Sequence, residues 1–385
     1  METGNQHELC QKRSFYIIGH MANAIEDAGE FLAKGVNALE VDIVHDNGKF
    51  YVSHDSHDSY ENIPTVEEYL PELKALLLAK AYNLSLIIWD MKCTDFDPNQ
   101  FIAIAKEKFS GGPCDGVAML MTHSDDHDFV NQYNGSYDNV GVGVDDTDIP
   151  PPQVEAIFKN GGQKNFSYAD GITTFLKKTD VFKNVTEAQR HRNQQDPGSF
   201  SIIYTWVLHK EAAMRTYLDT YIDGIMVDAG GVEKLKELVM LLPYGDVYEL
   251  AQNGYNPFTS APLPKYLLTV ETTDKFLAGT NTKMLFTLTG SSGSSLKSLT
   301  YSGNAVESLE KGSTTHVMLE GIDLGEIKSL TVQALTDGIG AGWLPEKISV
   351  ESKWMTTKLD FVFNVDDKDE WITKKGGVLI KFPSQ

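Results

Sequence analysis

The chain has 385 residues, of which 41% are hydrophobic and 23% are charged, and its formal net charge is −21. This length allows one large core or two domains, and the composition is typical of a soluble globular protein. The acidic charge excludes electrostatic binding to nucleic acid, which needs a basic surface, and it disfavours a general attraction to anionic membranes.

Apolar segments rich in β-branched residues alternate with segments of helical period up to about residue 240. The predicted strands are 14–20, 37–44, 84–92, 116–123, 139–145, 165–171, 201–208 and 223–228. The predicted helices are 23–35, 65–80, 99–109, 152–162, 186–195, 210–220 and 231–242, of which 186–195 is polar and short. This α/β alternation and its length favour a closed (β/α)8 TIM barrel, with a doubly wound open sheet as the alternative.

From about residue 244 the composition and the periodicity of the sequence change. Residues 244–262 are rich in Pro, Gly, Tyr and Asn and lack a clear period, which predicts a linker or a wrapping segment. Beyond them, short alternating segments between Gly, Ser and Thr turns predict a β-sandwich. These segments are 265–272, 283–290, 315–321, 329–335, 347–352, 358–365 and 377–382. We therefore expect a barrel over 14–243, a tail and linker over 244–262, and an all-β sandwich over 263–385.

The N-terminal residues and the cysteines give less information about the function. The first 20 residues lack a basic start followed by an apolar signal core, so we expect either a cytosolic chain or one whose signal has been removed. The three cysteines, Cys10, Cys93 and Cys114, have no C-x-x-C spacing, and a zinc site is not predicted. One disulfide is allowed, but the sequence does not identify its partners.

Carboxylates interrupt two of the predicted barrel strands. Glu40 and Asp42 lie two residues apart, so they share one face of a strand. Asp90 and Lys92 repeat this spacing on the third strand. Buried carboxylates that converge are costly unless a cation joins them, and a set without cysteine suits a hard ion such as Mg2+. Lys92 would extend the positive site toward a phosphate.

Other polar residues fall at the same predicted mouth, because the strands of such a barrel carry functional groups at their C-terminal ends. They are His20, His54, Tyr204, Trp206 and Asp228. An imidazole titrates near neutral pH, so His20 and His54 suit an acid and a base in phosphoryl transfer at a phosphodiester. Each residue also has a structural reading: the histidine as a hydrogen-bonded core residue, the carboxylates as backbone caps, and the indole as a core aromatic. Their convergence favours the site.

Two acidic clusters have the composition of a metal site, "HSDDHD" at 123–128 and "DDTD" at 145–148. We interpret both as solvated loops, because neither has an apolar frame. No G-x-S-x-G or G-x-G-x-x-G motif is present, so neither Ser/His/Asp hydrolysis nor dinucleotide binding finds support.

The segment "GHMANAIEDAGEFLAKGVNALEVDIVHDNGKFYVSHD" resembles the sphingomyelinase D/phospholipase D toxins of recluse spiders, members of the glycerophosphodiester phosphodiesterase-like barrel superfamily. "LIIWDMK", "ADGITT", "IYTWVLHKEAAMRTYLDTYIDGIMVD" and "QNGYNPF" also resemble stretches of that family. Together they cover most of residues 14–258. In this family the last motif plugs the lower end of the barrel.

The resemblance implies a role for each residue of the predicted mouth. His20 and His54 would be the catalytic pair. The Mg2+ ligands would be Glu40, Asp42 and Asp90, and the substrate-binding residues would be Lys92, Tyr204, Trp206 and Asp228. The family cleaves choline- or ethanolamine-bearing sphingolipids and lysolipids. The lipid's own hydroxyl expels the head-group alcohol and leaves a cyclic phosphate, and a secreted protein is implied.

Three departures from the family pattern surround the head-group pocket. The loop after His54 lacks the cysteine of the toxins, His209 stands where they have Asp, and Asp228 stands where they have Asn. The preference for choline therefore stays open. Met21 follows His20, whereas ordinary glycerophosphodiesterases have an H-R-G start, and this favours the toxin-like branch.

The C-terminal part resembles a PLAT (lipoxygenase-homology) β-sandwich in "YLLTVETTDKFLAGTNTKMLFTLTG", "GWLPEKISVES" and "FVFNVDDKDEWI". The resemblance implies binding to a membrane surface or to a protein partner, sometimes with Ca2+. Phe276 and Trp343 are candidate lipid contacts, although Trp343 suits a core position equally well. A β-module that only stabilises the enzyme is the alternative.

We therefore expect a Mg2+-dependent phospholipase D that acts on a sphingolipid or lysophospholipid at a membrane and forms a cyclic phosphate. The order of the roles of His20 and His54 is not decidable from the sequence. One alternative is a glycerophosphodiester phosphodiesterase that hydrolyses soluble substrates with water. Another is a lipid-binding protein without turnover.

Overall fold

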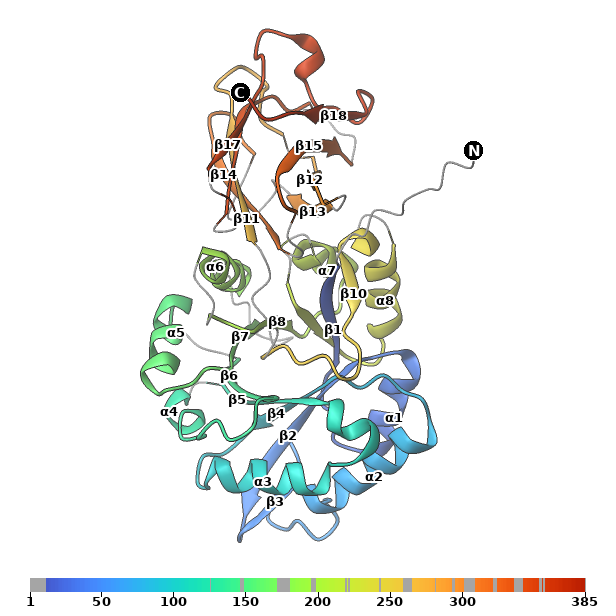
Figure 1. Ribbon diagram of the computed structural model, residues 1–385. Coiled ribbons are helices and arrows are strands. Elements are labelled where there is room, and N and C mark those ends of the chain that lie inside the picture. The colour runs from blue at the N-terminus through green and yellow to red at the C-terminus, as the bar shows by residue number, and fades with distance from the viewer. Residues whose placement is uncertain are drawn as a thin grey trace.

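The computed structural model describes residues 12–384 except for 125, 146–148, 172–180, 195–198, 219, 221, 242–243, 259–264, 281, 293–294, 301–308, 321–323, 336–341, 353–354 and 356. Figure 1 shows a barrel surrounded by helices, with two small antiparallel sheets beyond it. None of the described helices combines the length and the apolarity needed to cross a bilayer.

Eight parallel strands close the barrel. They are β1 (Arg13–Gly19), β2 (Ala38–Asp46), β4 (Leu86–Met91), β5 (Ala118–His123), β6 (Val140–Val144), β7 (Phe166–Gly171), β8 (Ile202–Trp206) and β9 (Gly224–Val227). Strand β1 pairs with both β2 and β9, so the sheet has no free edge between them. β3 (Lys49–Val52) adds an antiparallel edge to β2, and β10 (Tyr248–Leu250) adds a parallel one to β1. The closure confirms the predicted (β/α)8 barrel over the open sheet.

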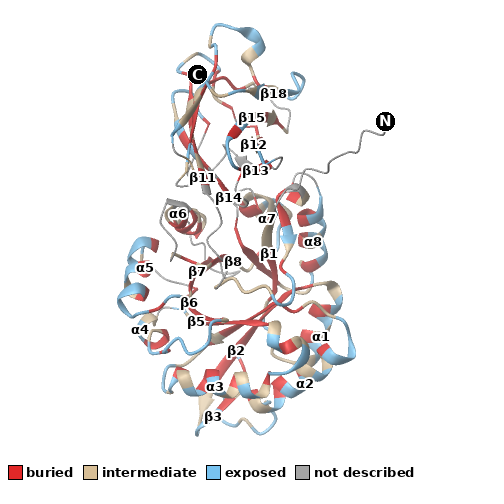
Figure 2. Cartoon of the chain, in the orientation of Figure 1, coloured by how far each residue is buried: buried red, intermediate tan, exposed pale blue. Residues whose placement is uncertain are grey.

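Helices pack around the barrel with their buried faces inward (Figure 2). They are α1 (Ile25–Lys34), α2 (Val66–Ala79), α3 (Pro98–Lys108), α4 (His127–Val130), α5 (Pro151–Asn160), α6 (Val181–Gln194), α7 (Glu211–Leu218) and α8 (Val232–Met240). Helix α1 illustrates the pattern, because it buries Ala28, Phe31 and Leu32 at helical spacing. It ends at Gly35, whose φ of 94° is the left-handed conformation that glycine adopts most easily.

Two helices differ from the sequence prediction. Helix α6 begins at Val181 and is 14 residues long, so the prediction of a short helix over 186–195 was wrong. Its buried apolar positions, Val181, Val185 and Ala188, begin before the polar stretch on which the prediction relied. Helix α4 lies in the segment interpreted as a solvated loop and buries Phe129 and Val130.

The tail after β10 closes the N-terminal end of the barrel. Asn253 Nδ2 donates to the carbonyls of Leu84 (2.7 Å) and Pro113 (2.8 Å), beside the starts of β4 and β5. The Phe258 ring packs against Gly141 at the start of β6, where a Cβ would come within 2.5 Å of the ring. The "QNGYNPF" segment therefore plugs the lower end, as the resemblance implied.

The C-terminal part consists of two four-stranded antiparallel sheets. One contains β14 (Thr314–Glu320), β11 (Lys265–Thr272), β16 (Pro345–Glu351) and β17 (Leu359–Val362). The other contains β13 (Ser295–Thr300), β12 (Met284–Gly290), β15 (Ile327–Ala334) and β18 (Val378–Lys381). Their inner faces share one apolar core, so the predicted sandwich is confirmed, with β13 as a strand that the prediction missed.

The two candidate lipid contacts of the sandwich have different environments. Trp343 is fully buried in its core, and its Nε1 donates to Thr272 Oγ1 over 3.0 Å. Trp343 therefore does not contact lipid in this fold. Phe276 is 84% exposed and its neighbour Leu277 is 61% exposed.

The barrel and the sandwich contact each other at η2, a short 3₁₀ helix (Tyr244–Asp246) after α8. Lys283, directly before β12, donates its Nζ to the Tyr244 hydroxyl over 2.7 Å, and this Nζ lies 4.7 Å from the centre of the Tyr244 ring. Leu285 of β12 packs with the apolar core between barrel and helices. Part of the segment predicted as a linker is thus packed against both bodies.

Candidate active site

Three carboxylates meet at the C-terminal ends of neighbouring strands. Glu40 and Asp42 lie on β2, and Asp90 on β4 is in register with Asp42. Oxygen atoms of the three lie within 4.8 Å of one another. Asp42 is only 1% exposed and Glu40 is buried, so water does little to screen their repulsion. The structure therefore brings together the three residues that the sequence predicted as metal ligands.

Lys92 provides part of the compensating charge. Its Nζ lies 2.9 Å from Asp42 Oδ1 and also bonds to Asp90 Oδ2. The backbone N–H of Lys92 donates to Ile43 O over 2.8 Å, which fixes the residue just beyond β4. Although burial disfavours the charged amine, the carboxylates of Asp90 and Asp42 raise the pKa of Lys92, so it stays protonated.

The loop after β1 holds two of the carboxylates. The N–H of Met21 donates to Glu40 Oε2 over 2.6 Å, and Met21 has a φ of 54°, a conformation that non-glycine residues rarely adopt. Asn23 Nδ2 donates to Asp42 Oδ2 over 2.7 Å, and Asn23 Oδ1 accepts the Asp42 N–H over 2.9 Å. A strained backbone conformation like that of Met21 is typical of functional sites. Neither Met21 nor Asn23 was among the site residues predicted from the sequence.

The carboxylates are suited to a divalent cation. Glu40 Oε1 is buried and has no hydrogen-bond partner among the described residues. Burial and the nearby charges of Asp42 and Asp90 raise the pKa of Glu40 well above its usual range. Burial likewise raises the pKa of Asp90. One lysine does not balance this set, and an all-oxygen donor set is what Mg2+ prefers. The residues present therefore fit the expected ion.

The two predicted catalytic histidines lie at the same end of the barrel as this cluster. His20 lies directly after β1, and its Nδ1 is 2.9 Å from Asp228 Oδ1, just beyond β9. His54 lies after β3, is half-exposed, and its Nδ1 bonds to Asp55 Oδ1 over 2.8 Å. The N–H of Ser53 donates to the backbone carbonyl of Asp42 over 3.0 Å, which keeps the start of the His54 loop at the mouth.

The two predicted pocket aromatics lie at different depths of the barrel. Tyr204 is fully buried inside it, where burial first and then the charges of Asp145 and Asp90 raise the pKa of its hydroxyl. Trp206 lies at the rim, and its Nε1 donates to the Asp145 carbonyl over 2.6 Å. Gly171 leaves room for this indole, because a Cβ there would come within 2.1 Å of the ring.

Asp145 is a fourth acidic residue at the mouth, and its interpretation as part of a solvated loop was wrong. It is buried just after β6, and burial raises its pKa well above the usual range, with a further contribution from Asp90 that Lys92 opposes. Residues 146–148 of that cluster lie outside the described residues. The available signal was the position of Asp145 at the end of a predicted strand, as for Asp90 and Asp228.

The other acidic cluster is largely a helix cap. Asp126 accepts the N–H of Phe129 over 2.8 Å and so begins α4. His123 ends β5, and its ring accepts the N–H of Asp126 over 3.1 Å. The His123 ring lies 6.0 Å from the ring of Phe129, so it packs against α4.

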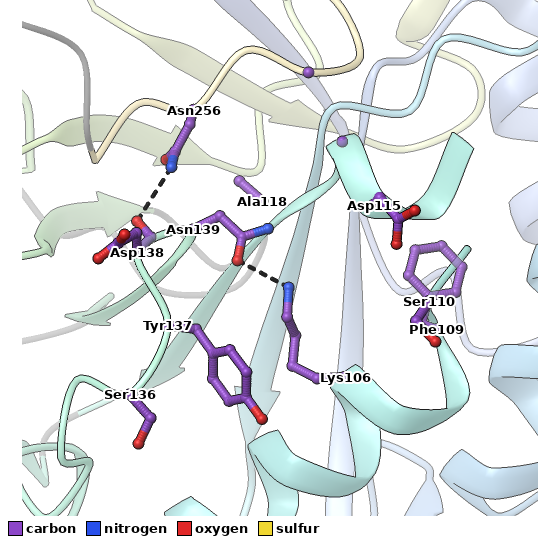
Figure 3. A pocket seen from close by; sticks show the side chains of 12 residues that line it. Lys106, Phe109, Ser110, Asp115, Ala118, Ser136, Tyr137, Asp138, Asn139 and Asn256 are labelled. Carbon is purple, nitrogen blue, oxygen red and sulfur yellow. Dashed lines mark hydrogen bonds between the residues drawn. The ribbon is translucent and has the colours of Figure 1, made fainter. Parts of the chain in front are cut away.

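A separate cavity of about 510 Å3 lies beside the barrel plug (Figure 3). Lys106 Nζ donates within it to Asn139 Oδ1 over 2.8 Å, and Asn256 of the plug donates to the Asp138 carbonyl over 3.1 Å. Its lining includes Ala118 at the start of β5, whereas the carboxylates lie at the opposite ends of the strands. This cavity is therefore distinct from the candidate active site.

Comparisons with known proteins identify the family of the chain and its C-terminal domain. The family model described as dermonecrotic toxin SPH matches residues 10–110 and 116–258, and the PLAT/LH2 domain model matches residues 266–376. Dermonecrotic toxin LapSicTox-alphaII1 of Loxosceles apachea is 27% identical over 278 residues, which are 64% of this chain and 99% of the toxin. LlSicTox-alphaIV1i of Loxosceles laeta is 26% identical over 285 residues, with 63% and 99% covered.

Among solved structures, a glycerophosphodiester phosphodiesterase from Parabacteroides distasonis is similar with a TM-score of 0.43 and 15% identity, covering 60% of this chain and 98% of that chain. The chain belongs to the dermonecrotic toxin SPH family and carries a PLAT/LH2 domain behind the barrel. This confirms the family recognised from the sequence, its barrel-plus-sandwich fold and its class as a phosphodiesterase of the phospholipase D type.

Proposed function

We propose that this enzyme is a Mg2+-dependent phospholipase D that removes the head group of a sphingolipid or lysophospholipid and leaves a cyclic phosphate. The observation that carries this proposal is the buried carboxylate cluster, whose Glu40 Oε1 lacks a partner among the described residues and whose two aspartates contact Lys92. Such a cluster is costly on its own and becomes useful when it holds an ion against a phosphate.

In this proposal the ion would be held by Glu40, Asp42 and Asp90. When bound, it would stabilise the negative charge that develops on the phosphate oxygens. Lys92 lies against the same carboxylates and would bind a phosphate oxygen. Trp206, whose Nε1 donates to the Asp145 carbonyl, and the buried Tyr204 of the same strand would shape the substrate pocket.

His20 and His54 would move the protons. One imidazole takes the proton of the lipid's own hydroxyl as its oxygen attacks phosphorus, and the other protonates the head-group oxygen as its bond to phosphorus breaks. His20 is suited to such a role, because Asp228 binds its Nδ1 and leaves its Nε2 for the substrate. The product pair is then a cyclic phosphate and a free head-group alcohol.

The surroundings of the reaction are also part of the proposal. The substrate is a membrane lipid, and the sandwich would dock the enzyme on the membrane surface through the exposed side chain of Phe276. The similar Loxosceles proteins are dermonecrotic toxins, which supports a secreted protein. A Ca2+ site in the sandwich stays a prediction.

The test is head-group release from sphingomyelin and lysophosphatidylcholine with Mg2+, read by phosphorus NMR and mass spectrometry. We expect a cyclic phosphate, full loss of turnover with EDTA, and at least ~100-fold lower kcat in Glu40→Gln together with weaker Mg2+ binding by calorimetry. Glu249→Gln, an exposed residue of β10, is the matched control. A linear phosphate would favour the hydrolytic alternative, and vesicle binding without any release would favour a lipid-binding protein.

A further inference from the structure

Two histidines share one carboxylate at the rim of the barrel. Asp228 Oδ1 lies 2.9 Å from His20 Nδ1, and Asp228 Oδ2 lies 3.4 Å from His209 Nδ1. The three residues come from different places in the fold, since His20 follows β1, Asp228 follows β9, and His209 lies between β8 and α7. Each carboxylate oxygen thus has its own imidazole.

The bridge matters because burial alone does not hold Asp228 in place. The side chain of Asp228 is 49% exposed and that of His209 is 45% exposed. An exposed carboxylate turns about its last torsion and exchanges partners with water, whereas an imidazole beside each oxygen restrains the carboxylate toward one orientation. A fixed Asp228 in turn fixes the ring of His20.

The backbone holds His209 where this contact needs it. The N–H of Leu208 donates to the carbonyl of Met226 over 3.0 Å, which ties the residue before His209 to β9 just ahead of Asp228. The next acidic residue along the chain, Glu211 at the start of α7, is paired with Arg215 (2.8 Å) and Lys234 (3.2 Å). His209 therefore contacts Asp228 rather than Glu211.

We infer that His209 is a positioning residue that acts through Asp228 to hold His20 in its working orientation and tautomer. An ionised carboxylate only accepts hydrogen bonds, so His20 Nδ1 carries a proton when it faces Asp228, and Nε2 is the atom left for proton transfer. The role of His20 in turnover belongs to the proposed function, and this inference rests on it. The bridge itself does not depend on the reaction.

A double-mutant cycle tests whether His209 affects turnover through Asp228. In His209→Ala we expect kcat to fall roughly tenfold with little change in KM, because the substrate contacts remain. In the Asp228→Ala background the same change should cost less than about twofold, because the carboxylate through which His209 acts is gone. His209→Gln, whose amide still donates to a carboxylate, should recover most of the activity. Multiplicative losses in the double variant, or a change confined to KM, would overturn the inference.

A second readout needs no turnover. With labelled histidine, proton NMR should show a downfield Nδ1–H signal of His20 in the unaltered protein, and His209→Ala should broaden or remove it. His316→Ala, at an exposed position of β14 in the sandwich, should leave both the signal and the activity unchanged. If no lipid is turned over, the proposed function fails while this signal still tests the bridge. An unchanged His20 signal in a folded His209→Ala protein refutes the inference.

Discussion

At the scale of single residues, the mouth of the barrel is governed by the balance of charge around Lys92. Its amine contacts Asp42 and Asp90, and both carboxylates lie where water screens poorly. Removing one partner of a buried ion pair typically costs about 3–5 kcal/mol, because the other partner stays uncompensated. Lys92→Met should therefore lower the free energy of unfolding by about this amount in metal-free buffer.

Mg2+ should restore part of that loss, since a bound cation replaces the missing charge and stabilises the folded state by mass action. The measurement is thermal unfolding of Lys92→Met with and without millimolar Mg2+. Lys108→Met is the control, because Lys108 pairs with the exposed Glu107 at the end of α3. Equal melting temperatures with and without Mg2+ in both the unaltered protein and Lys92→Met would count against an ion at this cluster.

The sequence predicted the three carboxylates of the cluster, but it did not predict the hydrogen bonds that hold them in place. Glu40, Asp42 and Asp90 were identifiable because a period of two places polar side chains on one face of an apolar strand. Met21 and Asn23 hold the carboxylates because Met21 has a positive φ and the loop after β1 turns back over β2. The hydrophobic periodicity of the sequence predicts neither feature. Asp145 follows the strand rule and was missed only because its acidic neighbours suggested a loop.

At the scale of secondary-structure elements, one buried charged cluster joins three parts of the barrel. Asp223, just before β9, bonds to Arg13 of β1 at 2.6 Å and to Arg192 of α6. It also accepts the N–H of Ile203 in β8 over 2.7 Å. Burial opposes its charge, but the two guanidinium groups outweigh burial and lower the pKa of Asp223. Asp223→Asn should cost about 3–5 kcal/mol of unfolding free energy at pH 7.

The pH dependence follows from the direction of that shift. The folded protein binds the Asp223 proton more weakly than the unfolded chain, whose Asp pKa is about 3.9. The stabilisation is therefore complete above about pH 3.9 and disappears as the pH falls through the lower pKa of the folded state. Urea unfolding of the unaltered protein and Asp223→Asn should differ at pH 7 and converge in acid. Asp58→Asn, at an exposed position, should show no such difference at either pH.

Strand and helix types were predictable because parallel strands buried on both faces form β-branched runs, and helices between them repeat every three to four residues. The bounds of helix α6 were not predictable, because most of its residues are polar and only three buried apolar positions mark its inner face. The plug was predictable only by resemblance. Its hold on the barrel comes from Asn253 reaching backbone carbonyls far away in the sequence, and composition shows only a segment without a period.

At the scale of the whole molecule, a barrel enzyme and a sandwich share a packed junction, and the surface of the sandwich carries an exposed apolar loop. Phe276 and Leu277 lie in the turn after β11, and Leu277 has a φ of 65°. Burying such side chains in lipid contributes about 1.5–3 kcal/mol each. The net charge of −21 favours zwitterionic over anionic vesicles for this contact.

Replacing both side chains, in Phe276→Ser/Leu277→Ser, should weaken sedimentation with phosphatidylcholine–sphingomyelin vesicles at least about tenfold, given that contribution per side chain. Turnover on vesicles should fall in parallel, whereas turnover of a short-chain substrate below its critical micelle concentration should not change, because the barrel mouth is untouched. Val378→Ser/Ile380→Ser, which removes two exposed apolar side chains from β18 of the same sandwich, is the matched control. Equal losses in both double variants would mean that general surface apolarity, rather than this loop, brings the enzyme to the membrane.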